Sequence, residues 1–493
     1  MRSKNQAFMK FRRSLLIGFC ALLPVILSRV AAQPVVPGWA EDAIWYQIFP
    51  ERFANGDSSN DPPGVQPWGG KPERNNYFGG DLKGIIDHLD YLERLGVNAL
   101  YLNPIFESPS NHKYHTSDYL KIDHNFGDER VFRKLVEECH RRKMRLILDG
   151  VFNHTGIHFF AFEDIKKNEE KSRYVKWYNV HSFPVSGPEK PNYEAWWGLG
   201  DLPKLMTGNP EVRKYLFEAT RHWMKTGIDG WRLDVPNEIP HEFWIEWRKL
   251  VKSENPDAYI VGEIWDDATP WLQGDQFDAV MNYRFRGGAV GFIALENQSP
   301  SQFDSVLEAQ RAAYPGRVDY ALQNLIGSHD TERFLTLCGG DADKLRLAVL
   351  LQMTYVGAPM IYYGDEVGLQ GGKDPDCRHT MEWDSTRWNR GLLDWYQKLV
   401  RIRNENRVLR RGSYKTVLVD NPGRTFAFIR EDGGEKAMVV LNGMARSRTI
   451  RPHDLAPAPG KWRELLSGAS YASDDSVEVR AGSGVILLGA AGE

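Results

Sequence analysis

Residues 230–238 read GWRLDVPNE, and this stretch decides how the rest of the chain is interpreted. Its apolar start predicts a short buried strand that runs into a loop, with Arg232 and Asp234 two residues apart. Alternate residues of a strand point the same way, so the guanidinium and the carboxylate are expected side by side. A carboxylate beside a permanently charged arginine stays ionised well below neutral pH and can act as a nucleophile. A buried ion pair that only holds the strand is the other interpretation, and this stretch alone leaves both open.

Strands of the same kind recur along the chain and alternate with amphipathic helices. Helical spacing of apolar residues predicts helices at 82–95, 131–142, 211–226 and 344–354. Eight short apolar strands separated by helices predict an α/β fold in which a parallel sheet closes into a (β/α)8 TIM barrel. The predicted strands are 43–49, 99–102, 145–149, 230–234, 259–263, 279–282, 325–328 and 360–363.

Two segments break this rhythm. Residues 155–208, after the third strand, are rich in Trp, Tyr, Pro and Gly, and so long a connection in a compact protein is usually functional. We interpret them as a subdomain inserted over the C-terminal face of the barrel. Short alternating strands and Gly/Asn turns over 411–493 predict a small antiparallel β domain. The barrel domain is therefore assigned to residues 33–410.

Residues 1–32 have the pattern of a secretory signal peptide. Basic residues precede an apolar run over 15–27, which is too short for a comfortable membrane span, and small residues follow it. Cleavage after Ala32 and a secreted or periplasmic location are expected. The mature chain would keep an odd number of cysteines without metal-ligand spacing, so no disulfide framework is implied. These cysteines are Cys139, Cys338 and Cys377.

The composition is that of an ordinary globular protein, with 42% hydrophobic residues and a formal charge of -3. Because there is no net basic excess, nucleic acid is not an expected partner. A membrane is not an expected partner either, once the signal is removed. The chain has 16 Trp, and exposed aromatic faces suit sugar rings, although Trp is also a large core residue.

Acidic residues cluster just after the predicted strands. Asp149, Asp234, Glu263 and Asp330 each follow a different strand, and active sites of (β/α)8 enzymes lie where these strand ends meet. Any one of them is more simply explained as a helix cap, but four at different strand ends are better explained by chemistry. Carboxylates gathered in one cleft repel one another, which suits a reaction centre that develops positive charge.

Glycoside hydrolysis has such a centre, because its transition state is oxocarbenium-like and needs one ionised and one protonated carboxyl group. Asp234, beside Arg232, is the expected nucleophile. Glu263 is flanked by apolar residues, so we expect a raised pKa and the role of acid/base. The groups expected to act on the sugar around them are Asp330, as transition-state stabiliser, and His154 and His329, as donors to hydroxyls.

These residues resemble the signature of the α-amylase family of glycoside hydrolases, and the likeness covers nearly the whole mature chain. The resemblance implies a barrel, an inserted domain B and a C-terminal β-sandwich, domain C. It also implies the roles argued above for Asp234, Glu263 and Asp330. The four stretches that carry it are 149–154, 230–238, 262–265 and 328–330.

Further matches extend the candidate sugar contacts. Tyr114 resembles the family's tyrosine that stacks on the sugar at the cleaved bond, whereas without the motif a loop tyrosine would be read as surface. The loop 372–378 resembles one that contacts sugars on the non-reducing side through Asp374 and Arg378. The expected substrate-binding residues are Tyr114, His154, Arg232, Trp265, His329, Asp374 and Arg378.

Three shorter stretches, 49–57, 202–205 and 328–333, resemble neopullulanases, cyclomaltodextrinases and maltogenic amylases. In that subgroup a matching loop holds calcium, so the resemblance implies a structural Ca²⁺ site. Oxygen ligands on a tight Asn/Asp/Gly loop suit a hard cation, and an Asx-rich turn that binds nothing is the alternative. The implied ligands are Asn55, Asp57, Asn60, Asp61, the Gly79 carbonyl and Asp81.

The chain also departs from this subgroup. The first barrel strand follows the signal almost directly, so the extra N-terminal β domain that shapes a dimer in those relatives is not expected. A monomer is therefore expected. Met206, His115 and Pro236 stand where Asn, Asp and Ala are usual. Because these positions lie in or near the cleft, the preference between cyclodextrin, pullulan and starch stays open.

The sequence therefore predicts a retaining hydrolase of α-1,4-glucosidic bonds in starch-derived oligosaccharides, pullulan or cyclodextrins. It would act through a covalent glucosyl ester on Asp234. A transglycosylase on the same scaffold is the first alternative, because water and sugar compete for that intermediate. A non-catalytic sugar-binding protein is the second, but it predicts lost carboxylates, whereas all three are present.

Overall fold

The computed structural model describes residues 36–456 and 460–490 of the chain. Its central sheet consists of β1 (Trp45–Ile48), β2 (Ala99–Leu102), β5 (Arg145–Gly150), β6 (Gly230–Leu233), β7 (Tyr259–Gly262), β8 (Ala279–Val280), β9 (Gln323–Leu325) and β10 (Ala358–Tyr362). These eight strands are parallel and lie in the order β8-β7-β6-β5-β2-β1-β10-β9. A parallel bridge between Met281 and Gln323 links the two ends of the sheet, so the strands form a nearly closed barrel. The predicted fold class is confirmed.

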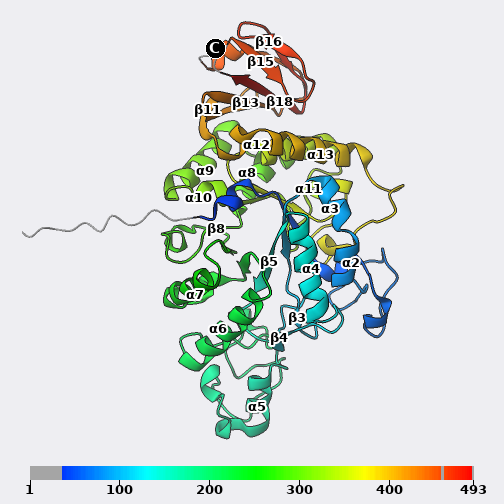
Figure 1. The fold of residues 1–493 in the computed structure, drawn as a ribbon, viewed down its shortest axis with the longest axis vertical. Coiled ribbons are helices and arrows are strands. Elements are labelled where there is room, and N and C mark those ends of the chain that lie inside the picture. The colour runs from blue at the N-terminus through cyan, green and yellow to red at the C-terminus, as the bar shows by residue number, and fades with distance from the viewer. Residues whose placement is uncertain (1–35, 457–459, 491–493) are drawn as a thin grey trace, which may run out of the picture. The chain divides into compact units, whose positions relative to one another are not determined.

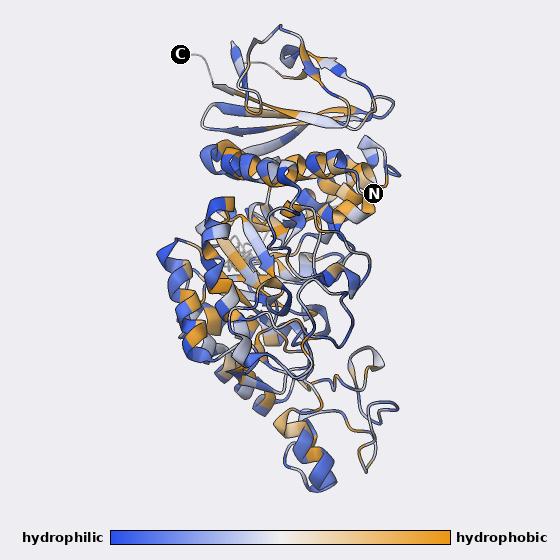
Figure 2. Ribbon diagram, turned by 90° about the vertical axis from the view of Figure 1, so that its right-hand side faces the viewer, coloured by the Kyte–Doolittle hydropathy of each residue, from blue (hydrophilic) through white to orange (hydrophobic). Residues whose placement is uncertain are grey.

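Helices connect most of these strands and surround the sheet (Figure 1). Apolar residues run along the central strands and alternate with polar ones on the helices, as expected for helices that bury one face (Figure 2). The helices of the barrel are α2 (Leu82–Asp87), α3 (Leu89–Leu95), α4 (Glu129–Arg141), α6 (Pro210–Met224), α7 (His241–Glu254), α8 (Tyr283–Ala289), α9 (Pro300–Ala313), α10 (Val318–Ala321), α11 (Phe334–Leu337), α12 (Ala342–Thr354) and α13 (Arg390–Glu405). Shorter elements between them include η1 (Gly38–Asp42), α1 (Pro50–Phe53), η2 (Ser58–Asn60), and a hairpin of β3 (Phe106–Glu107) and β4 (Asp118–Ile122).

Two predicted elements differ from the structure. The single helix expected over 82–95 is divided into α2 and α3 at His88, whose backbone leaves the helical region and whose Nδ1 lies 2.8 Å from Gly84 O. The strand expected at 325–328 lies at Gln323–Leu325 instead. Gln323 and Asn324 are polar yet fully buried, and Asn324 donates to Val356 O at 2.8 Å. A search for apolar runs therefore starts this strand too late.

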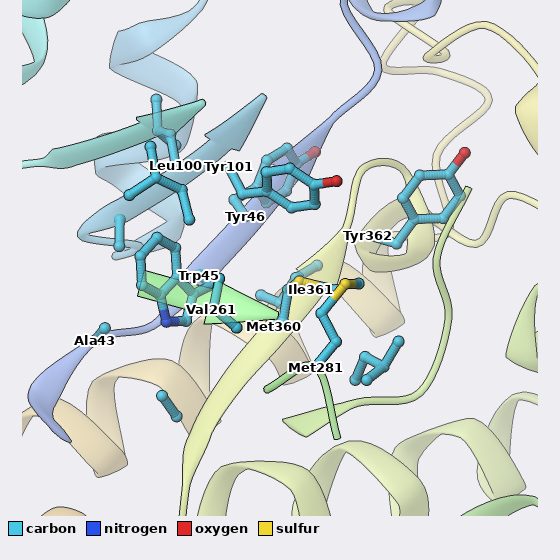
Figure 3. Close-up of a cluster of buried hydrophobic side chains, with 14 of the residues drawn as sticks. Ala43, Trp45, Tyr46, Leu100, Tyr101, Val261, Met281, Met360, Ile361 and Tyr362 are labelled. Atoms are coloured by element: carbon cyan, nitrogen blue, oxygen red, sulfur yellow. The ribbon is translucent and has the colours of Figure 1, made fainter. Parts of the chain in front are cut away.

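Large apolar side chains fill the barrel and its flanks. Figure 3 shows part of this core, with Trp45 of β1, Val261 of β7 and Met360 of β10 among the buried residues. The strands approach closely at Gly230, where a Cβ atom would lie 2.0 Å from Tyr259 O. Only glycine allows β6 to pair with β7 here, and this pairing sets the level at which the two strands end.

The segment predicted as an inserted subdomain contains little regular structure. It includes α5 (Phe160–Asn168), η3 (Glu169–Lys171), η4 (Val175–Trp177) and η5 (Trp196–Gly198). Aromatic rings supply much of its packing: Phe162 lies edge-on to Tyr178 and Tyr193, with ring centroids 5.0 and 4.8 Å apart. An isolated antiparallel bridge between His154 and Lys204 ties its start to its end.

The C-terminal region is an antiparallel β structure, as predicted. A six-stranded sheet has the order β11-β12-β13-β18-β15-β16, and β14 pairs with β17 beside it. The bounds are β11 (Ser413–Asp420), β12 (Thr425–Asp432), β13 (Glu435–Asn442), β14 (Arg448–Ile450), β15 (Lys461–Glu464), β16 (Ser470–Ala472), β17 (Val477–Val479) and β18 (Ser483–Ala490), with α14 (Arg407–Arg411) before them and α15 (Pro452–Leu455) after β14.

Two fully buried arginines bind the end of α12, one from α13 and one from the C-terminal sheet. Arg403 on α13 donates to Met353 O at 2.8 Å, and Arg430 on β12 donates to Thr354 O at 3.0 Å. The last carbonyls of a helix have no partner within it, so the two guanidinium groups satisfy carbonyls that would otherwise be buried without a hydrogen bond.

The signal peptide predicted over residues 1–32 lies outside the described residues. Within 36–456 and 460–490, no helix is both long enough and apolar enough to cross a bilayer. The three cysteines of the predicted mature chain are buried and free of disulfides.

Candidate active site

Side chains from four strand ends meet at the C-terminal rim of the barrel. Asp149 lies near the end of β5, whereas Asp234 directly follows β6 and Glu263 directly follows β7. Asp330 lies in the loop between β9 and α11. The register places Asp149 beside Arg232 on the neighbouring strand, so adjacent strands deliver their polar groups at one level. Four positions far apart in the sequence thus form one cluster.

Arg232 is the shared cation of this cluster. Its Nη1 donates to both carboxylate oxygens of Asp149, at 2.8 and 2.9 Å, and to Asp234 Oδ1 at 3.0 Å. Its Nη2 lies 2.8 Å from Glu263 Oε2. The side chain is fully buried and turned toward these carboxylates, so its geometry fits an electrostatic role better than the predicted sugar contact.

The protonation of the cluster follows from burial and shared charge. Burial raises the pKa of Asp234, and Glu263, Asp149 and Asp330 raise it further, against the pull of Arg232. Arg232 lowers the Asp234 pKa as expected, but burial and the three neighbouring carboxyl groups outweigh it, so the expected low pKa is wrong for the free site. Burial also raises the pKa of Glu263, to about 7, while Arg232 opposes the rise. The prediction that the Glu263 pKa is raised is confirmed.

Carboxyl groups this close share protons as a set. A proton on Glu263 removes one of the negative charges that disfavour an ionised Asp234. Arg232 can then hold Asp234 as a carboxylate through its directed hydrogen bond at 3.0 Å. The cluster can therefore provide one protonated acid and one ionised nucleophile at the same time.

A second arginine holds Asp330. Arg378 Nη2 donates to Asp330 Oδ1 at 3.1 Å, and its Nη1 lies 2.9 Å from Asp374 Oδ1. Its Nε donates to the carbonyl of His329 at 2.8 Å. The carbonyl of Arg378 in turn accepts from Arg52 Nε at 3.0 Å. The 372–378 loop is therefore held by hydrogen bonds both to the Asp330 loop and to Arg52.

His329 and Tyr114 form the floor beside Asp330. The amide Nε2 of Gln47 lies 2.8 Å from His329 Nδ1, so Nδ1 accepts and the ring hydrogen is on Nε2. Nε2 lies 2.7 Å from the Tyr114 hydroxyl and 3.1 Å from Asp330 Oδ2, and the Tyr114 hydroxyl donates to Asp149 at 2.9 Å. Burial and the nearby arginines lower the pKa of His329, which keeps the ring neutral.

Two amides in this network were not predicted from the sequence. Asn103, just after β2, donates to the Tyr114 hydroxyl at 3.0 Å, and Gln47 on β1 donates to Asn103 Oδ1 at 3.1 Å. Both are buried. The sequence did contain a clue to both residues, because a buried amide within or next to an apolar strand needs a hydrogen-bond partner.

Aromatic faces flank the carboxylates. Trp265 is 46% exposed and stacks on Tyr283, with centroids 3.7 Å apart, and its Nε1 donates to Glu263 Oε1 at 3.2 Å. An exposed indole face next to the acid/base suits the apolar face of a sugar ring.

A second aromatic group lies on the inserted segment and was also missed. His154 stacks on Trp196 at 5.3 Å, and Trp196 stacks on Trp197 at 4.9 Å, with Trp197 80% exposed. Trp196 Nε1 donates to Glu238 Oε1 at 3.0 Å, and Lys204 Nζ donates to the other oxygen of Glu238 at 3.0 Å. In the sequence, two adjacent tryptophans in a long loop, Trp196 and Trp197, could have indicated this aromatic surface.

The three departures from the resembled subgroup lie in different environments. Met206 is 43% exposed, whereas His115 is half-buried, with its ring edge-on to His112 at 4.9 Å. Pro236 is buried and begins η6 (Pro236–Glu238), directly after the nucleophile loop.

The residues implied as calcium ligands are close together in the loop around η2. A Cβ atom on Gly79 would lie 2.3 Å from Asp61 Oδ1, so the Gly79 backbone meets the Asp61 carboxylate directly. Asn60 Oδ1 is buried without a hydrogen-bond partner. Unused oxygen atoms on a tight loop are what a hard cation requires, so the residues present fit Ca²⁺.

Two of these carboxylates already have other partners. Asp81 accepts the backbone N–H groups of Gly56 and Gly84, at 3.1 and 2.6 Å, and caps α2. Asp57 accepts from Ser59 N at 3.0 Å and caps η2. Asp61 Oδ1 likewise accepts from Asn55 Nδ2 at 2.7 Å. The unpartnered Asn60 Oδ1 and the second oxygen of Asp61 are therefore the better candidates in this set.

Comparison with known proteins places this geometry among characterised relatives. Residues 47–391 match the family profile of the alpha amylase catalytic domain. The chain is 52% identical to Neopullulanase 2 of Thermoactinomyces vulgaris over 88% of its length and 74% of the relative's, and 51% identical to a cyclomaltodextrinase of Thermoanaerobacter pseudethanolicus over 84% and 72%. The ligand-free cyclic alpha-maltosyl-(1-->6)-maltose hydrolase from Arthrobacter globiformis has a similar fold, with TM-score 0.87 and 43% identity over 93% of this chain and 100% of that one.

Proposed function

Because the chain belongs to the α-amylase family of glycoside hydrolases, we propose that it is a retaining hydrolase of α-1,4-glucosidic bonds in starch-derived oligosaccharides, pullulan or cyclodextrins. One observation carries this proposal: the Arg232 guanidinium contacts both Asp234 and Glu263. Retention needs two carboxyl groups close together, and a shared guanidinium keeps them close. The names of the related neopullulanase and cyclomaltodextrinase support the substrate class.

In the first step Asp234 attacks C1 of the sugar while Glu263 gives its proton to the glycosidic oxygen. The C1–O bond breaks, the leaving sugar departs as an alcohol, and a β-glucosyl ester forms on Asp234. Asp330, held by Arg378, would stabilise the positive charge that develops at the sugar ring. His329, whose Nε2 hydrogen faces the Tyr114 hydroxyl and Asp330 in the free site, is the proposed donor to a sugar hydroxyl.

In the second step Glu263, now a carboxylate, removes a proton from water, and the water oxygen attacks C1. The ester to Asp234 breaks, the α-configured product leaves, and both carboxyl groups return to their starting states. The remaining proposed contacts with the sugar chain are Tyr114, His154, Trp265, Asp374 and Arg378. A sugar hydroxyl in place of this water would make the same reaction a transglycosylation.

Product analysis tests this proposal directly. Purified protein is mixed with maltoheptaose, pullulan and β-cyclodextrin, and the first products are followed by NMR at the anomeric carbon. Shorter glucans whose new reducing ends are α-configured are expected, and products longer than the substrate would reveal transfer to sugar. No product from any substrate, or β-configured first products, would refute the assignment.

We also propose that the loop around η2 binds a structural Ca²⁺ ion. The fit of Gly79 to Asp61 and the unpaired Asn60 oxygen support this proposal. With free Ca²⁺ at a hundred times the dissociation constant, binding would stabilise the fold by about 2.7 kcal/mol. EDTA should therefore lower the Tm measured by calorimetry, and excess Ca²⁺ should restore it.

Two variants make this test specific. Asp61→Ala should remove the Tm response to Ca²⁺, whereas Asp87→Ala, which removes a surface carboxylate on α2, should keep it. Equal Tm values for the wild-type protein in Ca²⁺ and in EDTA would contradict a calcium site.

Finally, we propose that the protein is exported, on the strength of the signal-like pattern of residues 1–32. Mass spectrometry of the protein from the producing cells should find a mature chain that begins at Gln33. An intact N-terminus on cytoplasmic material would refute export.

A further inference from the structure

The inserted segment carries an exposed aromatic side chain that the proposed reaction does not use. Trp197 is 80% exposed, the highest value among the large hydrophobic residues that the structure describes. Its backbone has φ 51° and ψ 24°, in the left-handed region, which is unfavourable for a residue with a Cβ atom. Exposed apolar surface and backbone strain are both concentrated at functional sites. We therefore examined what Trp197 is positioned to bind.

Hydrogen bonds hold the two neighbouring tryptophans in place. The N–H of Trp196 donates to Leu202 O at 3.0 Å, and the N–H of Leu199 donates to Trp196 O at 2.9 Å. Trp196 Nε1 donates to Glu238 Oε1 at 3.0 Å, and Glu238 lies in the loop that follows the proposed nucleophile. The indoles are thus positioned before any ligand arrives, so binding to them loses little conformational entropy.

Three rings connect this position to the active site. His154, Trp196 and Trp197 stack in succession, with centroids 5.3 and 4.9 Å apart and planes inclined by 19° and 18°. We call these three residues the aromatic ladder. His154 is buried, Trp196 is half-buried and Trp197 is exposed, so the ladder leads from the site to solvent. His154 Nε2 is buried and has no hydrogen-bond partner among the described residues, as expected for a group that meets a ligand.

The strand order indicates which end of the substrate the ladder meets. The ladder follows β5, and β5 and β9 lie four places apart in the nearly closed ring of eight strands, so they face each other across the barrel. The 372–378 loop follows β10, the neighbour of β9. Its resemblance assigns this loop to sugars on the non-reducing side of the cleaved bond. The ladder therefore faces the other side, where the leaving sugar lies.

We propose that the aromatic ladder binds glucose units on the leaving-group side of the cleaved bond, and that Trp197 gives the protein its preference for long chains over short substrates. This inference rests on the hydrolase activity proposed above. The apolar face of a glucose ring stacks on an indole, and the exposed face of Trp197 is free for such a contact. Trp197 binds substrate at a distance from the reacting atoms.

Trp197→Ala tests the contact. Alanine keeps the Cβ atom and hence the backbone strain, and an indole this exposed contributes little to packing, so the fold should persist. Loss of one stacking contact should lower kcat/KM on maltoheptaose about 10-fold, mainly through KM, because a remote contact is made equally in the ground and transition states. α-Glucosyl fluoride has no sugar on the leaving-group side, so its kcat/KM should stay within about a factor of two of wild type.

Transfer to an added sugar gives a second readout. With α-glucosyl fluoride as donor, Asp234 displaces fluoride and forms the ester. A maltose hydroxyl then gives its proton to Glu263, and its oxygen takes C1 from Asp234. Because this maltose occupies the leaving-group side, Trp197→Ala should need about 10-fold more maltose to give the same share of longer products. A purely structural role for Trp197 would leave this requirement unchanged.

Two further variants serve as controls. Trp197→Phe keeps an aromatic face and should retain most of the activity on maltoheptaose. Leu295→Ala removes another exposed apolar side chain, just after η8 (Val290–Ala294), and should behave as wild type on both substrates.

The outcomes separate this inference from the proposed function. Equal changes on maltoheptaose and on the fluoride in Trp197→Ala, or no change on either, would overturn the role of the ladder. An unaltered maltose requirement would do the same. A wild-type protein that hydrolyses neither substrate would instead refute the proposed function.

Discussion

Asp234→Asn is expected to lower kcat on maltoheptaose by at least about 10⁴-fold, a loss of the size seen when a catalytic nucleophile is removed. The amide of asparagine cannot form the glucosyl ester. Because the substitution also removes one of four clustered acidic groups, the folded state should be no less stable than that of the wild type. Initial rates and a thermal unfolding curve check both expectations.

The control for this variant is Asp266→Asn, which neutralises an exposed carboxylate three residues after Glu263. It should leave the rate within a factor of two of wild type. A fluorinated glucosyl fluoride that forms the ester quickly and loses it slowly should label the wild-type protein, and peptide mass spectrometry should locate the label on Asp234. A variant that retains a tenth of the wild-type rate, or a label on another residue, would refute the assignment.

Glu263→Gln should separate the two steps of the reaction. Glutamine cannot donate a proton, so hydrolysis of maltoheptaose should fall by about 10²-fold to 10⁴-fold. Ester formation from α-glucosyl fluoride should survive, because fluoride leaves without an acid. Added azide needs no base to attack, so it should restore turnover and give the α-glucosyl azide. Failure of azide to raise the rate on the fluoride would argue against Glu263 as acid/base.

The wild-type pH profile provides an independent check on Glu263. Burial raises the pKa of Glu263 to about 7, and the first step needs the protonated form. Above this pKa the protonated fraction falls tenfold per pH unit, so kcat/KM should decrease as the pH rises past about 7. The decline should be absent in Glu263→Gln when the fluoride is the substrate. A wild-type rate still rising at pH 9 would contradict this account.

Much of the barrel and the membership of the site could be predicted from local patterns. Short apolar strands alternating with helices identify a parallel barrel, because a strand buried on both faces must be apolar along its whole length. Asp149, Asp234, Glu263 and Asp330 could be found because each is an acidic residue just after an apolar run. The pattern failed at β9, where buried Gln323 and Asn324 are polar.

The partners of these side chains could not be predicted in the same way. The sequence indicated one Arg232–Asp234 pair, and the structure has one arginine among three carboxylates. Whether the Asp234 pKa is raised or lowered depends on all of these distances and on burial. The amides Gln47 and Asn103 likewise gained a role only when the strands placed them beside Tyr114 and His329.

By itself the sequence determined the fold class, the family and the acidic residues at the strand ends, because periodicity and short motifs are local properties of the chain. Only the tertiary structure decided which groups the residues of GWRLDVPNE contact. Pairing of β6 with β5 and with β7 places Asp149 and Glu263 on either side of Arg232, and the turn after Asp234 brings the Val235 N–H to Glu263 Oε2. Hydrogen bonds and shared charge act across a few ångströms of space between residues far apart in sequence, and these distances exist only in the folded barrel.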